Sequence, residues 1–297
     1  MTATDLGEAR LRELRQLAIE NRRLILRAIH RAKAGHLGGP LSCTDMLIAL
    51  YFEVLRIDPT RPRWEERDRF VLSKGHSSIA LYAAMALRGY LPIDELFTFD
   101  AIDSRLQGHP DMTALPGLDM STGSLGQGLS PGVGMALGAR FLGKDFRTWV
   151  MVGDGDAQEG QIWEAAMVAS RYDLDNLTAI LDLNGLQQVG WPTEAGYTAR
   201  ARRPPLDQPR ERWEAFGWQV LECDGHEIGA FIGACEEARR IRGRPGVIIA
   251  HTVKGKGISF MEGEHVWHAK PITDEELAIG LAELDAQEAT LAEAVPG

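Results

Sequence analysis

Two oxygen-bearing side chains that suit a divalent cation, Asp154 and Asn184, each follow a short apolar run. The runs are Trp149–Val152 and Leu177–Leu183, and both have the length and composition of buried parallel strands. In an open α/β sheet, the carboxyl ends of neighbouring strands lie on the edge where ligands bind. Because Mg²⁺ takes one or two protein oxygens and fills its shell with water and phosphate, the pattern indicates a magnesium–phosphate site. Alternatively, Asp154 and Asn184 only cap turns.

The segment between these side chains is typical of one β-α-β unit. Gly153 and Gly155 flank the carboxylate and allow a sharp turn with close approach to a ligand. Apolar residues at helical spacing then predict the buried face of a helix, formed by Ile162, Trp163, Ala166 and Met167.

Another candidate anion site follows the predicted strand Arg69–Leu72. The turn Ser73–Ser78 places serines, a glycine and His76 before a predicted helix that runs through Leu87. A helix N-terminus presents free N–H groups and favours anions. The alternative is that Ser77 only caps this helix.

Three further histidines lie in loops that contain glycine or proline: His36, His109 and His268. Imidazole ordinarily titrates near neutral pH, so these residues suit general acid–base chemistry. His226, at the end of a predicted strand, is interpreted as structural.

The elements that must position these residues form an α/β fold, with an open, mostly parallel sheet and helices on both faces. Further strands are expected at Trp218–Glu222 and Gly246–Thr252. Helices are expected over residues 7–33 and 228–241. Two further helices are each expected to begin with a capping box. One begins at Ser42 and Asp45 and runs through Leu55, and the other begins at Thr273 and Glu276 and runs to about residue 294.

Three other segments carry further predictions. Gly35–Pro40 is expected to be non-helical, and the polar segment Leu186–Arg212 is expected to be an active-site loop. The helix after Ser130 is rich in small residues, which predicts close packing against another element or chain; they are Gly132, Gly134, Ala136, Gly138 and Ala139.

Composition excludes several classes of partner. The chain has 297 residues and a net charge of −10, which argues against nucleic acid or an anionic membrane as the main partner. Its three cysteines are odd in number and show no metal spacing, which favours reduced thiols and a cytoplasmic location. The charged N-terminus has no apolar signal core, and no apolar run reaches the ~20 residues of a membrane span.

Several of these motifs together resemble those of transketolases, which use thiamine diphosphate. The motifs are Gly-Asp-Gly with Asn184 thirty residues after Asp154 and Gln-Glu-Gly between, AKAGHLGGPLSCTDML, SKGHSS, GHP, GSLGQG and WHAKP. The resemblance covers residues 10–275. It implies a thiamine-diphosphate-binding fold over residues 1–275, followed by a C-terminal helix and tail over 276–297. It also implies that Asp154, Asn184 and the carbonyl of Leu186 hold Mg²⁺ on the cofactor diphosphate.

The resemblance assigns further residues to the cofactor. His76 and Gly155 would contact the diphosphate. The Gly123 carbonyl and the Leu125 side chain would contact the aminopyrimidine ring, although Leu125 alone could equally be a core residue.

It also assigns residues to catalysis. His36 would lie beside the donor sugar, and His109 over the thiazolium and the substrate. His268 is preferred to His265 for a further position above the cofactor. Glu159 would reach across the interface to the other domain; alternatively, Glu159 is only a carboxylate at the start of a helix, where the helix dipole favours it. Leu37 stands where the family motif usually has proline, which is a departure from the family in the loop around His36.

The family also uses a pyrimidine-binding domain that supplies an activating glutamate, and the sequence is expected to lack it. The chain is therefore predicted to be the N-terminal subunit of a two-chain transketolase, in which two copies of it assemble with two copies of a C-terminal partner subunit. It would transfer a two-carbon ketol unit between sugars or sugar phosphates. The alternatives are half of a thiamine-diphosphate-dependent 2-oxo acid decarboxylase or synthase, and a non-catalytic Rossmann-like interaction subunit.

Overall fold

A single parallel sheet organises the computed structural model, which describes residues 6–188 and 207–293. Its strands are β1 (Arg69–Leu72), β2 (Thr148–Gly153), β3 (Leu177–Leu183), β4 (Gln219–Asp224) and β5 (Gly246–His251). The order across the sheet is β1-β2-β3-β5-β4, and every neighbouring pair is parallel. The α/β fold expected from the sequence is confirmed.

Alternation along the strands builds a separate apolar core on each face of the sheet. In β3, Ile180 belongs to one core, whereas Ala179 and Leu181 belong to the other. All three are almost fully buried, as expected for a parallel sheet with both faces covered.

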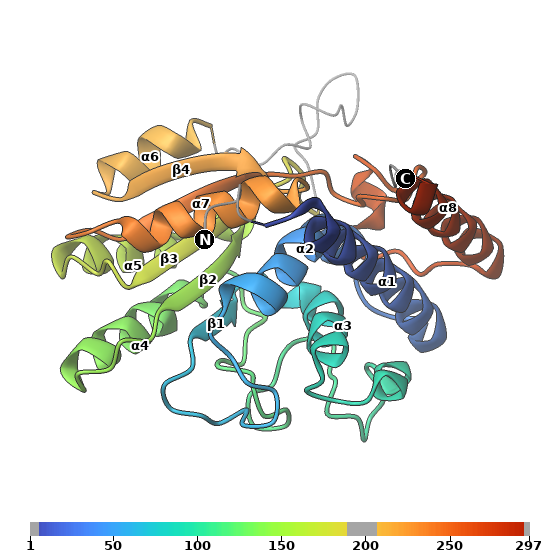
Figure 1. The fold of residues 1–297 in the computed structure, drawn as a ribbon, viewed down its shortest axis with the longest axis horizontal. Coiled ribbons are helices and arrows are strands. Elements are labelled where there is room, and N and C mark those ends of the chain that lie inside the picture. The colour runs from blue at the N-terminus through green and yellow to red at the C-terminus, as the bar shows by residue number, and fades with distance from the viewer. Residues whose placement is uncertain (1–5, 189–206, 294–297) are drawn as a thin grey trace.

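Helices cover both faces (Figure 1). The first core is built with α1 (Glu8–Ala32), α2 (Gly38–Ala49), α3 (Ser78–Arg88) and α7 (Ile228–Arg240), and α8 (Asp274–Glu293) packs on α1. The second core is built with α4 (Leu129–Phe141), α5 (Gly160–Arg171) and α6 (Pro209–Ala215). A π-helix spans Leu50–Val54, and short 3₁₀ helices span Gly75–Ser77, Ile93–Thr98, Asp156–Gln158 and His265–His268.

The start of α2 differs from the expectation. The helix begins at Gly38, so Gly39 and Pro40 lie in its first turn. The first four N–H groups of a helix have no partner within it, so a proline at its third position removes no hydrogen bond. The predicted capping box is wrong, because Ser42 donates to the Gly39 carbonyl at 2.9 Å and Asp45 pairs with a buried arginine.

The buried face of α5 was also partly mispredicted. Met167 is 53% exposed, and the buried residues are instead Ile162, Ala165, Ala166 and Ala169. These follow the spacing of a single helical stripe. Bulky Trp163 stays half-buried beside it, with its indole N–H donated to the Ala157 carbonyl at 3.0 Å.

One further expectation is confirmed, and another is confirmed only in part. At the start of α8, Glu276 accepts from the Thr273 amide at 2.9 Å, and Thr273 Oγ1 accepts from the Glu276 amide at 3.2 Å, which completes a capping box. In α4, a Cβ at Gly132 would clash with Val150 of β2, so this glycine permits close packing, whereas Gly134 faces open space.

Most of the expected loop Leu186–Arg212 lies outside the described residues, and α6 occupies its end. Among residues 6–188 and 207–293, none of the helices is both long and apolar enough for a membrane span.

Candidate active site

A cavity of about 180 Å³ opens where β1, β2, β3 and β5 end, and is called here the strand-end cavity. It collects residues that follow four different strands. Its lining consists of Gly39, Lys74, His76, Leu125, Gly153, Asp154, Gly155, Asp156, Asn184, Leu186, Gln187, Gln188, Lys254 and His268. Seven of the predicted site residues are therefore brought together: His76, Leu125, Asp154, Gly155, Asn184, Leu186 and His268.

Asp154 is 2% exposed and accepts two amide hydrogens, from Gly155 at 2.8 Å and from Gly185 at 2.6 Å. Burial, with a contribution from nearby Asp182, raises the pKa of this carboxyl to about 7. A bound cation would favour the ionised form. The Asn184 Oδ1 atom accepts the Leu186 amide at 3.1 Å, so these two residues are also held beside the cavity.

Beneath the cavity lies a buried ion pair that sequence reasoning missed. Lys74 and Asp182 are 1% and 0% exposed, and the Lys74 ammonium contacts the Asp182 carboxylate. Asp182 also accepts from Ser42 Oγ at 2.7 Å and from the Thr252 hydroxyl. Although burial opposes ionisation, Lys74 holds the pKa of Asp182 below its ordinary value. The available signal was a charged residue inside the apolar run of β3, because a buried charge needs a partner.

Lys254 was also missed as a site residue. It follows β5, is 2% exposed and places Nζ 2.8 Å from Nδ1 of His268. Burial lowers the pKa of this ammonium to about 8. The cavity therefore has a cationic side chain that is poorly solvated and faces the same space as Asp154.

Four histidine rings gather beside the cavity. The His36 centroid lies 5.3 Å from that of His76, 6.1 Å from that of His109 and 5.1 Å from that of His268. The rings of His76 and His268 are also 5.1 Å apart. His268 thus adjoins the cluster, whereas Nδ1 of His265 is buried without a hydrogen-bond partner.

The protonation of this cluster differs from the expectation of near-neutral titration. Burial, followed by His109 and Lys254, lowers the pKa of His36 to about 4. Burial and Lys254 lower the pKa of His268 to about 3, and the pKa of His76 also lies well below its ordinary value. In the protein without ligands these three rings are neutral at pH 7.

Two glycines let loops approach one another closely. A Cβ at Gly75 would lie 2.7 Å from the Gly123 nitrogen, and a Cβ at Gly123 would lie 3.0 Å from the His109 ring. The Thr122 hydroxyl anchors this loop on the Leu72 carbonyl at 2.7 Å. His109 of the cluster and the adjoining Gly123 therefore do not line the cavity.

Glu159 lies further out. It is exposed, and its Cβ packs so closely on Gly126 (φ +81°) that a side chain at that glycine would not fit. The Gly126 amide donates to Asp156, whose other carboxylate oxygen is buried without a partner. Leu125, 38% exposed, connects this region to the cavity.

This donor set fits a diphosphate with Mg²⁺. Asp154, Asn184 and the Leu186 carbonyl are hard oxygen donors, and Lys254 and His76 supply groups for an anion. Among the residues that the structure describes, no group of three or more His, Cys, Asp or Glu side chains could hold a metal. The fit therefore rests on an oxygen set that is completed by phosphate.

The sequence of this chain is similar to those of transketolases. The family model for the transketolase thiamine diphosphate binding domain matches residues 14–289. The 6-deoxy-6-sulfo-D-fructose transketolase subunit of Clostridium sp. (strain MSTE9) is 45% identical over 264 residues, which are 89% of this chain and 93% of that protein. An apulose-4-phosphate transketolase subunit of Phocaeicola vulgatus is 43% identical, over 84% of this chain and 85% of that protein.

A solved structure is also similar. The transketolase from Campylobacter jejuni is 30% identical with a TM-score of 0.79, and the match covers 95% of this chain. It covers 48% of that chain, so this protein spans about half the length of the solved enzyme.

Proposed function

The chain belongs to the transketolase family, and from that premise we propose that it is the diphosphate-binding subunit of a two-chain transketolase. The enzyme would use thiamine diphosphate and Mg²⁺ to transfer a two-carbon ketol unit from a ketose to an aldose. The observation that carries the proposal is the strand-end cavity, which joins Asp154, Asn184 and Lys254 to the cluster of histidines. We assign residues 1–275 to the cofactor-binding domain and 276–297 to a terminal helix and tail.

The cavity would hold the diphosphate end of the cofactor. Asp154, Asn184 and the Leu186 carbonyl would bind Mg²⁺, while His76 and Gly155 would contact the phosphates, since all five line the cavity. Gly123 and Leu125 would contact the aminopyrimidine. Thiamine diphosphate, when bound, supplies the carbon nucleophile and the electron sink for ketol transfer.

The histidines would handle protons of the sugar. The Lys254 ammonium can donate only to an unprotonated Nδ1, so His268 carries its proton on Nε2. Nε2 of His268 would then donate to a sugar hydroxyl or carbonyl. His36 is neutral and His109 is exposed, so either ring could accept a proton from a hydroxyl.

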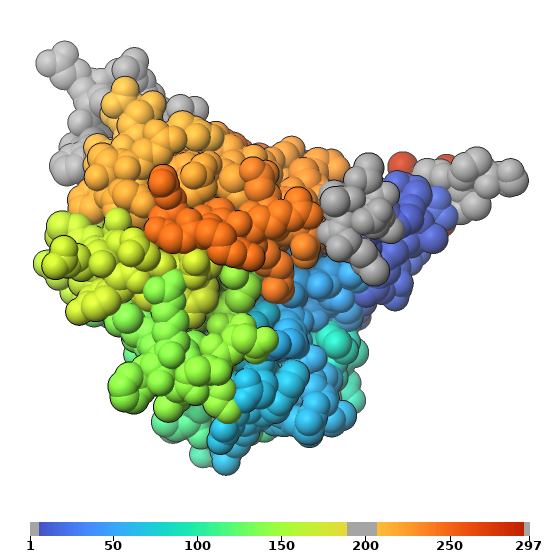
Figure 2. All heavy atoms as spheres, turned by 60° about the vertical axis from the view of Figure 1, so that its left-hand side comes forward, coloured from blue at the N-terminus to red at the C-terminus, as the bar shows by residue number. Residues whose placement is uncertain are grey.

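A second chain would complete the site. The relatives named as transketolase subunits match this chain over most of their length, which supports a two-chain enzyme. Exposed apolar residues also lie in the C-terminal halves of α4 and α5 and just after them, two helices that are green to yellow-green in Figure 2: Phe141, Leu142, Met167, Val168 and Tyr172. Leu125 lines the cavity, and exposed Glu159 directly precedes α5. A pyrimidine-binding partner would cover them, with two copies of each subunit for closed two-fold symmetry.

The substrates would be sugars or sugar phosphates. The two relatives carry names that specify a sulfonated and a phosphorylated sugar, which favours a substrate with an anionic end. A cytoplasmic location would suit the three free cysteines, Cys43, Cys223 and Cys235.

Incubation of the reconstituted enzyme with panels of ketose donors and aldose acceptors tests the reaction class. Mass spectrometry should detect an acceptor lengthened by two carbons and a donor shortened by two. Release of CO₂ from 2-oxo acids without ketol transfer would instead assign the chain to the decarboxylase or synthase alternative.

A further inference from the structure

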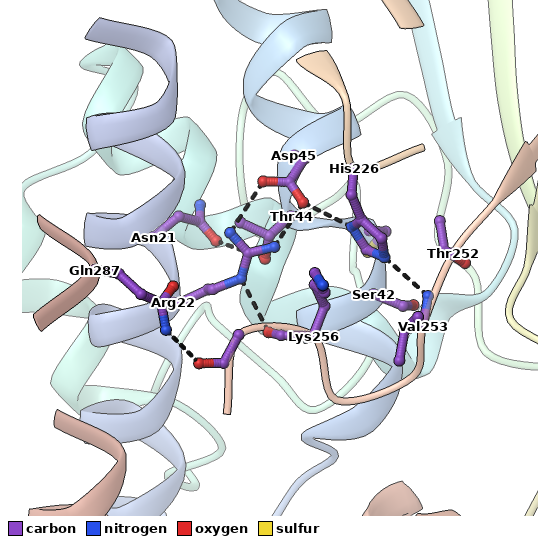
Figure 3. Close-up of polar contacts among 12 residues, drawn as sticks. Asn21, Arg22, Ser42, Thr44, Asp45, His226, Thr252, Val253, Lys256 and Gln287 are labelled. Carbon is purple, nitrogen blue, oxygen red and sulfur yellow. Dashed lines mark hydrogen bonds and ion pairs between the residues drawn. The ribbon is translucent and has the colours of Figure 1, made fainter. Parts of the chain in front are cut away.

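A mostly buried polar network, which contacts the backbone at Val253 and Lys256, links four parts of the chain (Figure 3). Arg22 of α1 forms two hydrogen bonds with the Asp45 carboxylate of α2, at 2.9 and 2.6 Å. His226, in the turn between β4 and α7, places Nδ1 2.8 Å from the same carboxylate. The Val253 amide donates to Nε2 of His226 at 2.8 Å.

These contacts fix the tautomer of His226. A backbone N–H can only donate, so Nε2 must be unprotonated and the ring hydrogen must lie on Nδ1. Although burial opposes ionisation, Arg22 and His226 hold the pKa of Asp45 at about 2, so this carboxylate is an acceptor. His226 therefore donates a hydrogen bond to Asp45 and accepts one from the Val253 amide.

The network clamps the segment that carries Lys254 on both sides. The Val253 amide is held before it by His226, and the Lys256 carbonyl is held after it by Nε of Arg22 at 3.0 Å. A third bond runs from Gln287 of α8 to the Gly257 carbonyl at 2.7 Å. Lys254 lies between these anchors and reaches the strand-end cavity, where it meets His268.

We propose that His226 is a positioning residue for the active site: by accepting the Val253 amide, it fixes the backbone from which Lys254 reaches the diphosphate and His268. The sequence-based interpretation of His226 as merely structural is thereby extended. Its effect on the cofactor rests on the proposed function, whereas its effect on the 252–257 segment does not.

Two substitutions separate the two bonds of His226. In His226→Gln the side-chain amide reaches the Nε2 position, so its oxygen can still accept the Val253 amide. In His226→Asn the shorter amide occupies the Nδ1 position, so it can donate to Asp45 but cannot reach Val253. His251→Asn is the matched control. His251 and His226 line the same surface hollow, but His251 is exposed and pairs with Glu222.

The first measurement is hydrogen exchange by mass spectrometry on the chain alone. The peptide over residues 252–258 should exchange faster in His226→Asn, while His226→Gln and His251→Asn should retain wild-type protection there. Thermal unfolding of each variant reports the general loss of stability. Equal protection of this peptide in His226→Asn and wild type, or equal loss in both His226 variants, would overturn the proposal.

The second measurement is titration calorimetry of thiamine diphosphate with Mg²⁺, on the chain reconstituted with its partner. Loss of an outer contact that orients a metal ligand typically costs about 10- to 100-fold in affinity. By the same reasoning, a loss of at least about tenfold is expected here for His226→Asn only. Absence of binding to the wild-type protein would contradict the proposed function, while the exchange data would still decide the role of His226. A tenfold loss shared by His226→Gln would contradict that role.

Discussion

Lys254 Nζ lies 2.8 Å from Nδ1 of His268, and this contact joins the anion-binding part of the cavity to the histidine cluster. Lys254 is buried and His268 is half-buried, and burial lowers the pKa of each. An anionic diphosphate beside Lys254 would reverse part of that effect, because it favours the charged ammonium. A bound diphosphate and the histidine cluster would thus be linked electrostatically through Lys254.

The first prediction tests this lysine. Lys254→Met should weaken thiamine diphosphate binding by roughly 10- to 100-fold, since a hydrogen bond to a charged group contributes about 1.5–3 kcal/mol. Lys256→Met is the control, because that side chain lies two positions away and pairs with Glu262. Equal affinities of the two variants in calorimetry would show that Lys254 does not contact the diphosphate.

The second prediction concerns Mg²⁺. Asp154→Asn removes the charge, but its NH2 group cannot accept one of the two amide hydrogens that the carboxylate accepts from Gly155 and Gly185, so the chain alone should lose about 1–3 kcal/mol of stability. Its thermal stabilisation by thiamine diphosphate with Mg²⁺ should be lost as well. Wild type in EDTA should likewise not be stabilised by thiamine diphosphate. If thiamine diphosphate raised its melting temperature as much in EDTA as with Mg²⁺, the metal assignment would be wrong.

The third prediction concerns acid. The pKa of His268 is about 3 in the folded chain and 6.5 ordinarily. Between pH 3 and pH 6.5, the unfolded chain therefore binds more protons than the folded chain. Stability should therefore fall as pH drops from 6.5 to 4, and His268→Gln should reduce that fall by roughly 2–3 kcal/mol. Denaturant unfolding at both pH values measures it, with exposed His251→Gln as control. The same loss of stability in wild type and His268→Gln would contradict a half-buried, neutral His268.

The fourth prediction concerns the sugar. His36→Ala and His109→Ala should lower turnover with a ketose donor by ~10²–10⁴-fold, the usual contribution of a general acid or base. Cofactor affinity should change little, because neither ring lines the strand-end cavity. Wild-type turnover in both variants would show that neither His36 nor His109 takes part in catalysis.

Local patterns predicted the five strands of the sheet and the convergence of Asp154 and Asn184 on one sheet edge, because parallel strands carry their ends there. The position assigned to His268 came instead from the family resemblance. Local patterns did not reveal the Lys74–Asp182 pair, whose members lie 108 residues apart and meet only through the strand order. Nor did they give the low pKa values of the histidines, since these depend on burial created by several loops at once.

The start of α2 was missed for a different physical reason. Glycine and proline usually end helices, but in the first turn the missing N–H of Pro40 has no cost. The earlier start also affects the lining of the cavity, because the Gly39 carbonyl accepts from Lys74 at 3.1 Å and Ser42 donates to Asp182.

The most direct test of the two-chain account is reconstitution. This chain and a pyrimidine-binding partner chain would be purified separately and assayed for ketol transfer, alone and mixed, with saturating thiamine diphosphate and Mg²⁺. A mixture containing Asp154→Asn gives the background. The account predicts activity only in the mixture with the wild-type chain, together with a complex containing two copies of each subunit by light scattering. Full activity of this chain alone would contradict it.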